Sequence, residues 1–479
     1  MGAAGLLAAS PRLLAGCSSS DAAAVAMPWP TTISTEPPIL GGDSALDWWN
    51  RGNYASVMDE LDVANLEVVG AIPPTLNGLF VRNGANPASG ESSHWFMGDG
   101  MVHGMRIENG QAKWYRNRFI QTQAYKESTA SPAANRANTS VYLHNGKLLA
   151  LYEAGMPTEL SPSDLSTIGE YDYAGALQGS MTAHPKTDPA TGALHFMGYN
   201  SFNEPYLTYY KADASGILVT QESIEIPQPT MMHDFQLTKT HAVFYDLPIV
   251  FDVNELLASG FPFRWAPDLG ARIGVMPLNG TGADTVWVDV DTCFMFHTFN
   301  AYDDAQGRVV LEGCRLPSLW ADSAADAITT PTPWRWTIDP VAATVSEGAF
   351  QDFGMDFPMI DKRMQGQKHR ISYGLRLVGG TDDYPTHPVG IAKHDAASGN
   401  TVRWDCGEAY QPDEALFVPD SGAAGEDEGW LLTVVYDRAN DSSLLCILDA
   451  SNIEAGPVAR VSLPRRVPFG FHGTWVDLG

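Results

Sequence analysis

The sequence predicts an all-β fold, a radial array of four-stranded blades of the β-propeller type. Short runs of strand-forming residues, separated by turn clusters, extend from about residue 60 onward, and long amphipathic helical patterns are scarce. A single closed barrel would be too small for more than 400 residues, whereas a ring of blades removes long exposed strand edges. No clean repeat is visible, so the blades cannot be counted from periodicity.

Two hairpins are the clearest local features. Asn109-Gly110 lies within Val102–Trp114, between two runs in which apolar and polar residues alternate. Asn145-Gly146 occupies the same kind of position within Ser140–Glu153. Asn-Gly favours the tight turn whose twist matches that of paired strands. Further strand-like runs are Ala193–Tyr199, Tyr206–Lys211, His241–Phe251, Thr285–Asp291, Arg308–Cys314, His369–Val378, Val389–Lys393, Trp430–Tyr436, Leu444–Asp449 and Val458–Leu463. Short helices are predicted at Ala45–Trp49, Val253–Ala258 and Ser323–Ile328.

Composition excludes several classes of function. The chain has 29 basic and 56 acidic residues and a formal net charge of −27, which argues against nucleic acid as a partner because phosphate binding needs clustered basic residues. No apolar run reaches the ~18–20 residues of a spanning helix, and no dinucleotide fingerprint follows a predicted strand. The five cysteines form no C-x-x-C pair, which argues against a disulfide framework or a cysteine zinc site. Three of them lie in apolar runs and are expected to be buried thiols: Cys293, Cys314 and Cys446.

Residues 1–40 are set apart as a leader, and residues 41–479 are predicted to form a single propeller domain. The segment Leu14-Ala15-Gly16-Cys17 is similar to a bacterial lipoprotein cleavage box, which makes Cys17 a candidate for lipidation. No basic region precedes it, although a signal peptide needs one. The prediction is therefore divided evenly between an exported, periplasmic bacterial protein, with or without a lipid anchor, and a cytoplasmic one.

Four histidines have small or apolar neighbours instead of a charged surface run: His184, His233, His297 and His472. They are separated by 49, 64 and 175 residues, and the first two separations are about one four-stranded blade each. Side chains from different blades converge only on the propeller axis, where several histidines would form a metal site with nitrogen ligands. For any one of them alone, a core histidine is the more common role. Spacing by itself only suggests an axial metal centre.

A series of motifs extends from the first predicted strands to the C-terminus. They are Asn77–Gly84 (NGLFVRNG), His94–Met101 (HWFMGDGM), Thr182–Lys186 (TAHPK), His233–Phe235 (HDF), His297–Ala301 (HTFNA), Phe357–Asp361 (FPMID) and Phe469–Thr474 (FGFHGT). Together they resemble the carotenoid cleavage oxygenase family, non-haem iron enzymes that cut conjugated double bonds. The resemblance covers roughly residues 55–479.

The resemblance implies a seven-bladed β-propeller capped by a dome of loops and short helices. It also implies one ferrous ion, Fe(2+), per chain, held on the axis by the four histidines. In this family, carboxylates accept the second ring N–H of three of the ligands, which fixes the tautomer and ring orientation. By motif position, these pairs are His233 with Glu153, His297 with Asp356, and His472 with Glu414. Asp356 stands where the family usually has Glu, and it is shorter by one methylene, roughly 1.5 Å. Either the backbone lies closer to the ring or a water bridges the two groups.

The implied reaction is cleavage of a conjugated carbon–carbon double bond by O2, with both oxygen atoms entering the two carbonyl products and the substrate supplying the electrons. Aromatic residues near ligand or carboxylate positions are candidates for the wall of a substrate tunnel, where π faces would stabilise positive charge. These candidates are Phe96, Tyr152, Phe235, Phe296, Phe299 and Phe471. Simple core packing is an equally common role for buried aromatic residues.

The substrate class rests on fewer residues. Stilbene-cleaving relatives carry Lys immediately before the first orienting Glu; this chain has Tyr152, which favours an apocarotenoid-like polyene over a stilbene or phenylpropene. A non-oxidative, isomerase-type reaction and a non-catalytic propeller binding protein are the alternatives. Ile120–Thr139 is short and polar where carotenoid-cleaving relatives often have a membrane-docking segment. Val253–Trp265 is the best apolar patch for peripheral membrane contact or substrate entry, and packing in the core of the dome is an equally open role for it. The sequence predicts no oligomeric state.

Overall fold

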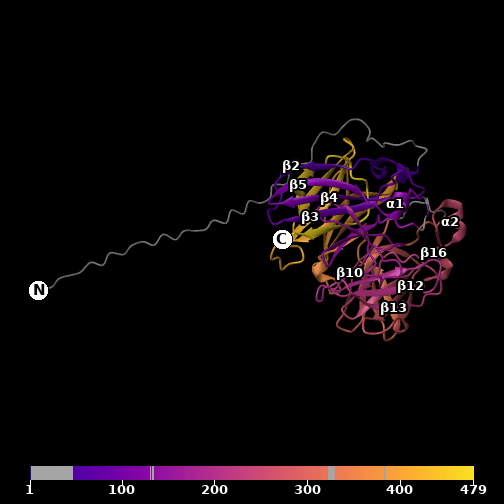
Figure 1. Ribbon diagram of the computed structural model, residues 1–479. Helices are drawn as coiled ribbons and strands as arrows, with labels where there is room; N and C mark the ends of the chain where they lie inside the picture. Colours follow the sequence, from indigo (N-terminus) through magenta and orange to yellow (C-terminus); the bar gives the residue numbers. More distant parts are fainter. Residues whose placement is uncertain (2–46, 130, 132–133, 322–329, 382–383, 479) are drawn as a thin grey trace.

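Seven antiparallel sheets follow one another around a ring in the computed structural model, which describes residues 1, 47–129, 131, 134–321, 330–381 and 384–478. Each sheet is one blade, and its strands follow one another in the chain except where the ring closes (Figure 1). The propeller fold predicted from the strand pattern and the seven blades implied by the family resemblance are therefore confirmed.

Blades 1 to 4 contain the N-terminal half of the ring. Blade 1 orders β1 (Asp62–Ala64), β5 (Gln111–Phe119), β4 (Gly100–Glu108), β3 (Gly78–Ala85) and β32 (Gly473–Asp477). Blade 2 contains β6 (Ser140–His144), β7 (Lys147–Leu151), β8 (Thr158–Leu160) and β9 (Thr167–Glu170). Blade 3 contains β10 (Lys186–Thr187), β11 (Leu194–Tyr199), β12 (Leu207–Ala212) and β13 (Leu218–Ile224). Blade 4 contains β14 (Gln236–Leu237), β15 (His241–Asp246), β18 (Ala271–Pro277) and β19 (Val286–Val290).

Blades 5 to 7 complete the ring. Blade 5 contains β20 (Phe294–Asp303), β21 (Val309–Leu316), β22 (Thr332–Asp339) and β23 (Thr344–Ala349). Blade 6 contains β24 (Gly354–Ile360), β25 (Ile371–Thr381), β26 (Tyr384–Asp395) and β27 (Asn400–Asp405). Blade 7 contains β28 (Tyr410–Pro419), β29 (Gly429–Asp437), β30 (Ser442–Asp449), β31 (Pro457–Ser462) and β2 (Val68–Gly70).

The remaining elements connect or cover the blades. A small sheet pairs β16 (Ile249–Phe251) with β17 (Phe263–Trp265), and the α-helices of the described ranges are α1 (Gln123–Glu127) and α2 (Val253–Ser259). The 3₁₀ turns there are η1 (Trp48–Asn50), η2 (Gly52–Tyr54), η3 (Trp95–Met97), η4 (Pro267–Leu269), η5 (Gly282–Asp284), η6 (Lys362–Met364) and η7 (Ile453–Ala455). No helix in the described part of the chain has both the length and the apolar character needed to span a membrane.

The turns and strands predicted from local sequence patterns are confirmed. Both Asn-Gly pairs form the predicted turns: Asn109 and Gly110 have φ of 52° and 71°, and Asn145 and Gly146 have 48° and 74°, as a type I′ turn requires. Every predicted strand-like run contains a strand, although His241–Phe251 is divided between β15 and β16. The buried thiols are also confirmed, since Cys293, Cys314 and Cys446 are buried and unpaired.

The helix predictions had mixed outcomes. Val253–Ala258 is confirmed as α2. Of the helix predicted at Ala45–Trp49, the structure describes residues 47–49, where the chain begins the 3₁₀ turn η1 instead of an α-helix. There Trp48 packs edge-on against the Tyr54 and Trp95 rings, whereas the Trp49 indole N–H donates to the Ser92 carbonyl. The two side chains therefore point to different partners and do not form one apolar face of a helix. The Ser323–Ile328 prediction lies outside the described residues.

The core lies between neighbouring blades, and the first strands of the blades line the axis. Seven buried clusters each join the facing sides of two adjacent sheets, for example blades 4 and 5 around Trp336 and blades 7 and 1 around Phe80. Along the axis β14 contacts β20, β20 contacts β24, β24 contacts β28, β28 contacts β32 and β32 contacts β6. The C-terminal strand β32 closes the ring by pairing with β3 (Figure 1). Side chains from all blades can therefore meet at one place.

This closure gives a first testable expectation. A Cβ added at Gly78 of β3 would collide with the Trp475 ring and the Val476 carbonyl of β32. Gly78→Ala is therefore expected to lower the free energy of unfolding by ~1–3 kcal/mol, the usual cost of overpacking, as measured by chemical denaturation. Gly348→Ala is the matched control, since Gly348 is also a strand glycine but has open space around it. An unchanged Gly78→Ala midpoint would contradict this packing.

Candidate metal centre and substrate cavity

The four predicted histidines meet on the propeller axis. His184 lies two residues before the inner strand β10, and His233 lies three residues before β14. His297 lies in β20, and His472 immediately precedes β32. The Nε2 atoms are 2.9 Å apart between His184 and His233, 3.3 Å between His233 and His297, and 3.1 Å between His297 and His472. Blades 3, 4, 5 and 1 thus each contribute one nitrogen to a common centre.

This spacing fits a metal ion. One ligand atom from each of the four residues lies within 4.8 Å of all the others. A metal about 2.1 Å from each nitrogen would separate neighbouring ligands by roughly 3 Å, which matches the contacts above. Burial, followed by the neighbouring histidines, lowers the pKa of His184 and of His472 well below the ordinary value of 6.5. These rings are therefore neutral at physiological pH, as metal ligation requires.

Three carboxylates orient three of the rings from the outside. Glu153 contacts Nδ1 of His233, Asp356 accepts from Nδ1 of His297 at 2.8 Å, and Glu414 accepts from Nδ1 of His472 at 2.8 Å. Asp356 and Glu414 lie in the inner strands β24 and β28, and Glu153 follows β7. Blades 2, 6 and 7, which hold no ligand, therefore supply the partners that fix the tautomers so that Nε2 faces the centre.

The shorter Asp356 contacts His297 directly. Of the two arrangements that the sequence left open, the structure shows the one in which the backbone lies close enough and no bridging water is needed. The next residue, Phe357, has φ of 49°, a conformation that bulky residues adopt rarely and that marks local strain. It lets the Phe357 N–H donate to Asp356 at 2.8 Å and places the Phe357 ring 4.9 Å from that of His297.

β-Bulges aim these side chains at the axis. The pairing register shifts between Met295 and Thr298 in β20, between Asp356 and Met359 in β24, and between Pro412 and Ala415 in β28. Each shift lies at a functional side chain, namely His297, Asp356 or Glu414. Because a bulge bends a strand and turns one side chain out of the regular alternation, the three inner strands present a ligand or a partner without losing their ladders.

A cavity of about 350 Å³ opens beside the centre, and His233, His297 and His472 form part of its wall. Most of the lining is aromatic or aliphatic, as in sites that enclose an apolar ligand. Of the six aromatic candidates from the sequence, the structure places four on this wall: Phe96, Tyr152, Phe296 and Phe471.

Comparisons with known proteins agree with this architecture. The sequence profile of the retinal pigment epithelial membrane protein family matches residues 54–477. The carotenoid cleavage oxygenase of Mycobacterium tuberculosis is 31% identical over 89% of this chain and 96% of its own. The chain belongs to the carotenoid cleavage oxygenase family. Among solved structures, cobalt-substituted Synechocystis apocarotenoid oxygenase superposes with a TM-score of 0.81 at 28% identity, covering 90% of this chain and 98% of its own. Lignostilbene dioxygenase of Pseudomonas brassicacearum gives 0.82 at 27%, covering 94% and 100%.

Two of the six aromatic candidates do not lie on the cavity wall. Phe235 stacks on Phe244 with centroids 6.0 Å apart, in the cluster between blades 3 and 4. Phe299 packs against Phe350 between blades 5 and 6. Both lie two residues beyond a ligand histidine. Because a strand advances about 3.3 Å per residue, these positions lie deeper in the propeller than the ligands, and neither ring is part of the cavity wall.

Sequence reasoning missed other parts of the wall. Tyr199 donates its hydroxyl to Glu153 at 2.9 Å and so holds the carboxylate that orients His233. Tyr54, Trp48 and Trp95 form one aromatic section of the cavity. Trp95 could have been predicted as a wall residue, since it belongs to the His94–Met101 motif. Tyr199 carries no local signal, because only the packing of blade 3 beside blade 2 brings it to Glu153.

The cavity reaches the surface beside α2, and α2 lies at the edge of the molecule (Figure 1). Phe202 and Leu256 belong to the lining, and Phe202 is 62% exposed, so the wall continues to the exterior. Leu257 of α2 is 80% exposed. Leu256, Phe261 and Phe263 of the apolar segment Val253–Trp265 thus belong to the cavity wall. Cys17 lies outside the described residues.

Proposed function

We propose that this chain binds one ferrous ion between its four histidines and uses O2 to cleave a conjugated carbon–carbon double bond into two carbonyl products. The observation that carries the proposal is a four-histidine centre, oriented by three carboxylates, in the wall of an aromatic cavity. Relatives named as carotenoid and apocarotenoid oxygenases support it.

The residues present suit ferrous iron, for which imidazole nitrogen is a common ligand. When bound, the iron supplies activation of O2, while a conjugated alkene supplies the electrons. Four neutral imidazoles leave the centre with its full +2 charge, unlike sites that include a carboxylate ligand. The cavity wall orients the alkene and keeps water away. The faces of Phe96, Phe296 and Phe471 stabilise positive charge on the polyene.

The favoured substrate class is an apocarotenoid-like polyene. Tyr152 occupies the cavity wall at the position where stilbene-cleaving relatives carry Lys. Burial raises the pKa of Tyr152 to about 12, so its hydroxyl stays neutral and offers no cation to a phenolate. An apolar polyene needs no such cation and fits the aromatic lining. Stilbene cleavage is kept as the second candidate, because the fold matches lignostilbene dioxygenase over the whole of that protein.

Peripheral contact with a membrane is proposed as the route by which so apolar a substrate arrives. Phe202, Val253 and Leu257 are each more than half exposed near the entrance. Inserting these side chains into a bilayer would remove apolar area from water. Lipidation of an exported chain at Cys17 is the alternative route. Mass spectrometry of the mature N-terminus distinguishes a lipid-modified protein from a cytoplasmic one.

The decisive experiment for the function uses anaerobically purified, iron-loaded protein. It is incubated with a panel of apocarotenals and hydroxystilbenes under ¹⁸O2. Two labelled carbonyl products from an apocarotenal are the expected result. Labelled products from a stilbene would move the substrate class to the second candidate. Conversion without label would indicate isomerase-type chemistry, and iron retention with no conversion of any compound would favour a binding protein.

Tyr152 gives a prediction about selectivity. Tyr152→Lys is expected to raise kcat/KM for a hydroxystilbene relative to an apocarotenal by about tenfold or more, since a charged hydrogen bond to a phenolic oxygen contributes about 1.5–3 kcal/mol. Tyr152→Phe is the matched control and should leave hydroxystilbene turnover no better than in the wild type. Steady-state kinetics on both substrates measures the ratio. An unchanged ratio in Tyr152→Lys would show that this position does not select the substrate.

A further inference from the structure

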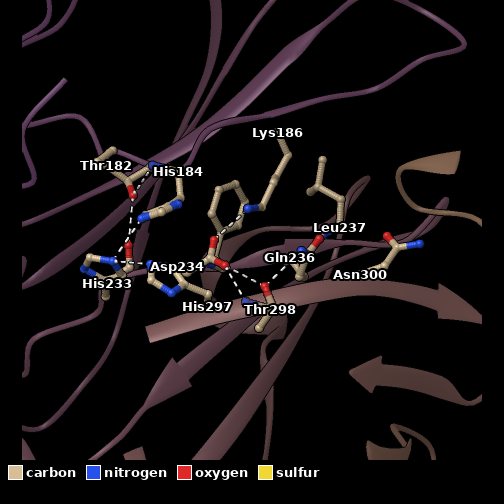
Figure 2. A network of polar contacts seen from close by, with 12 residues as sticks. Thr182, His184, Lys186, His233, Asp234, Gln236, Leu237, His297, Thr298 and Asn300 are labelled. Carbon is tan, nitrogen blue, oxygen red and sulfur yellow. Dashed lines mark hydrogen bonds and ion pairs between the residues drawn. The ribbon is translucent and has the colours of Figure 1, made fainter. Parts of the chain in front are cut away.

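A buried carboxylate links the segments that carry three of the histidines. Asp234 follows His233 directly, Thr298 follows His297 directly, and Lys186 lies two residues after His184. Figure 2 shows the three side chains converging beside the ligand rings, with Asp234 in the middle. Blades 3, 4 and 5 thus meet at one carboxylate.

The contacts of Asp234 use both of its oxygens. Oδ1 accepts from Nζ of Lys186 at 2.7 Å and from the Phe235 N–H at 2.8 Å. Oδ2 accepts from Oγ1 of Thr298 at 2.6 Å and from the Thr298 N–H at 3.1 Å. Asp234 is 1% exposed. A carboxylate so buried and so fully bonded has one well-defined position.

We propose that Asp234 is a positioning residue that holds three inner segments in one register and thereby sets the spacing of the His184, His233 and His297 nitrogens. The inference rests on the proposed function in one respect, namely that these histidines hold a metal. It adds that their geometry depends on a bridge that touches no ligand nitrogen.

The backbone hydrogen bonds between strands hold the three histidine-bearing segments only weakly. The inner strands β10 and β14 are only two residues long, and β20 is bulged between Met295 and Thr298. The Lys186–Asp234–Thr298 bridge joins the chain at these weak points: Lys186 begins β10, Asp234 lies two residues before β14, and Thr298 is at the bulge of β20. A functional centre must be held to within about 0.5 Å, which short ladders do not ensure. His472 does not share this bridge, and the Gly473 N–H beside it donates to Glu414 at 2.8 Å.

Blade 4 offers a matched control in Asp246. Its carboxylate is also buried, and it also accepts from a threonine hydroxyl, Thr230 Oγ1 at 3.0 Å, and from a cation, Arg272 Nε at 2.8 Å. Neither Thr230 nor Arg272 is adjacent in the sequence to a ligand histidine. Loss of either charge should lower the stability of the fold, but only loss of the Asp234 charge should alter the metal centre.

The test titrates Co²⁺ into the full-length apoprotein and records the visible spectrum of the bound ion, a readout independent of turnover. Asp234→Asn is expected to weaken Co²⁺ binding by roughly 10–100-fold, the usual effect of losing an outer partner, and to change the spectrum. Asp246→Asn is expected to bind Co²⁺ as the wild type does, with a lower unfolding midpoint. Thr298→Val keeps the side-chain shape and the backbone N–H, so it should weaken Co²⁺ binding by a smaller factor. It replaces Asp234→Asn as the test variant if Asp234→Asn does not fold.

Wild-type affinity and spectrum in Asp234→Asn, or in Thr298→Val if the former does not fold, would overturn the proposal. Equal weakening in the Asp234 and Asp246 variants would also overturn it, because the effect would then be general destabilisation. Failure of the wild type itself to bind Co²⁺ is a different result: it would refute the metal centre of the proposed function, and the positioning role with it.

Discussion

His297→Ala is expected to abolish cleavage and to leave the purified protein almost free of iron. The Nε2 atom of His297 lies within 3.3 Å of the Nε2 atoms of both His233 and His472. Its loss therefore removes the nitrogen ligand that lies between these two other ligands. Metal affinity should fall by more than the roughly 10–100-fold that losing an outer partner costs. Metal analysis by mass spectrometry and product formation by chromatography measure the two effects.

The matched control for this variant is His241→Ala. His241 is a partly exposed histidine that also faces a carboxylate, since its Nδ1 lies 3.4 Å from Asp303. Its removal should leave iron content and rate unchanged. Added imidazole should restore part of the metal binding of His297→Ala by filling the space. A His297→Ala protein with full iron content and wild-type turnover would contradict the assignment of this ligand.

Asp356→Ala is expected to produce the second-largest loss, roughly 10–100-fold in metal affinity or in activity. Without the carboxylate at 2.8 Å, the His297 ring is free to rotate or to change tautomer, and Nε2 no longer faces the metal. Asp356→Asn keeps an oxygen that accepts from Nδ1, so it should lie between the alanine variant and the wild type. Chelator competition measures the affinity of each variant.

Asp303→Ala controls for the loss of a histidine-facing carboxylate on the neighbouring strand β20, because Asp303 contacts His241 instead of a ligand. It should retain wild-type affinity for iron. If Asp356→Ala and Asp303→Ala behave alike, the Asp356 contact does not orient the ligand. The order wild type, Asn, Ala in affinity is the signature of an orienting acceptor.

Much of the fold could be predicted because its signals are local. The Asn-Gly pairs fix the backbone of their own turns, and alternating runs mark strands without knowledge of their neighbours. Trp48 and Trp49, at the end of the helix predicted at Ala45–Trp49, lie in a 3₁₀ turn for the opposite reason, since contacts with Trp95 and with the Ser92 carbonyl, both distant in the chain, hold their side chains. Blade number was not accessible from periodicity and came from the resemblance.

The site shows the same division between local and long-range information. Residues next to a ligand or its partner, such as Phe296, Phe471 and Tyr152, could be placed on the cavity wall from the sequence. Phe235 could not, because strand alternation does not reveal how deep a position lies in the blade. The bridge at Asp234 was present in the His-Asp-Phe motif, yet its role depends on which blades adjoin.

The central claim is that the axial centre of this chain cleaves a double bond with O2, and one labelling measurement tests it most directly. Iron-loaded protein reacts with an apocarotenal under ¹⁸O2, and the carbonyl products are reduced at once to alcohols to prevent exchange with water. Dioxygenase cleavage at this centre predicts two fragments that each contain one ¹⁸O atom, and no fragments from His297→Ala. Fragments whose oxygen comes from water, or fragments formed equally by His297→Ala, would contradict it.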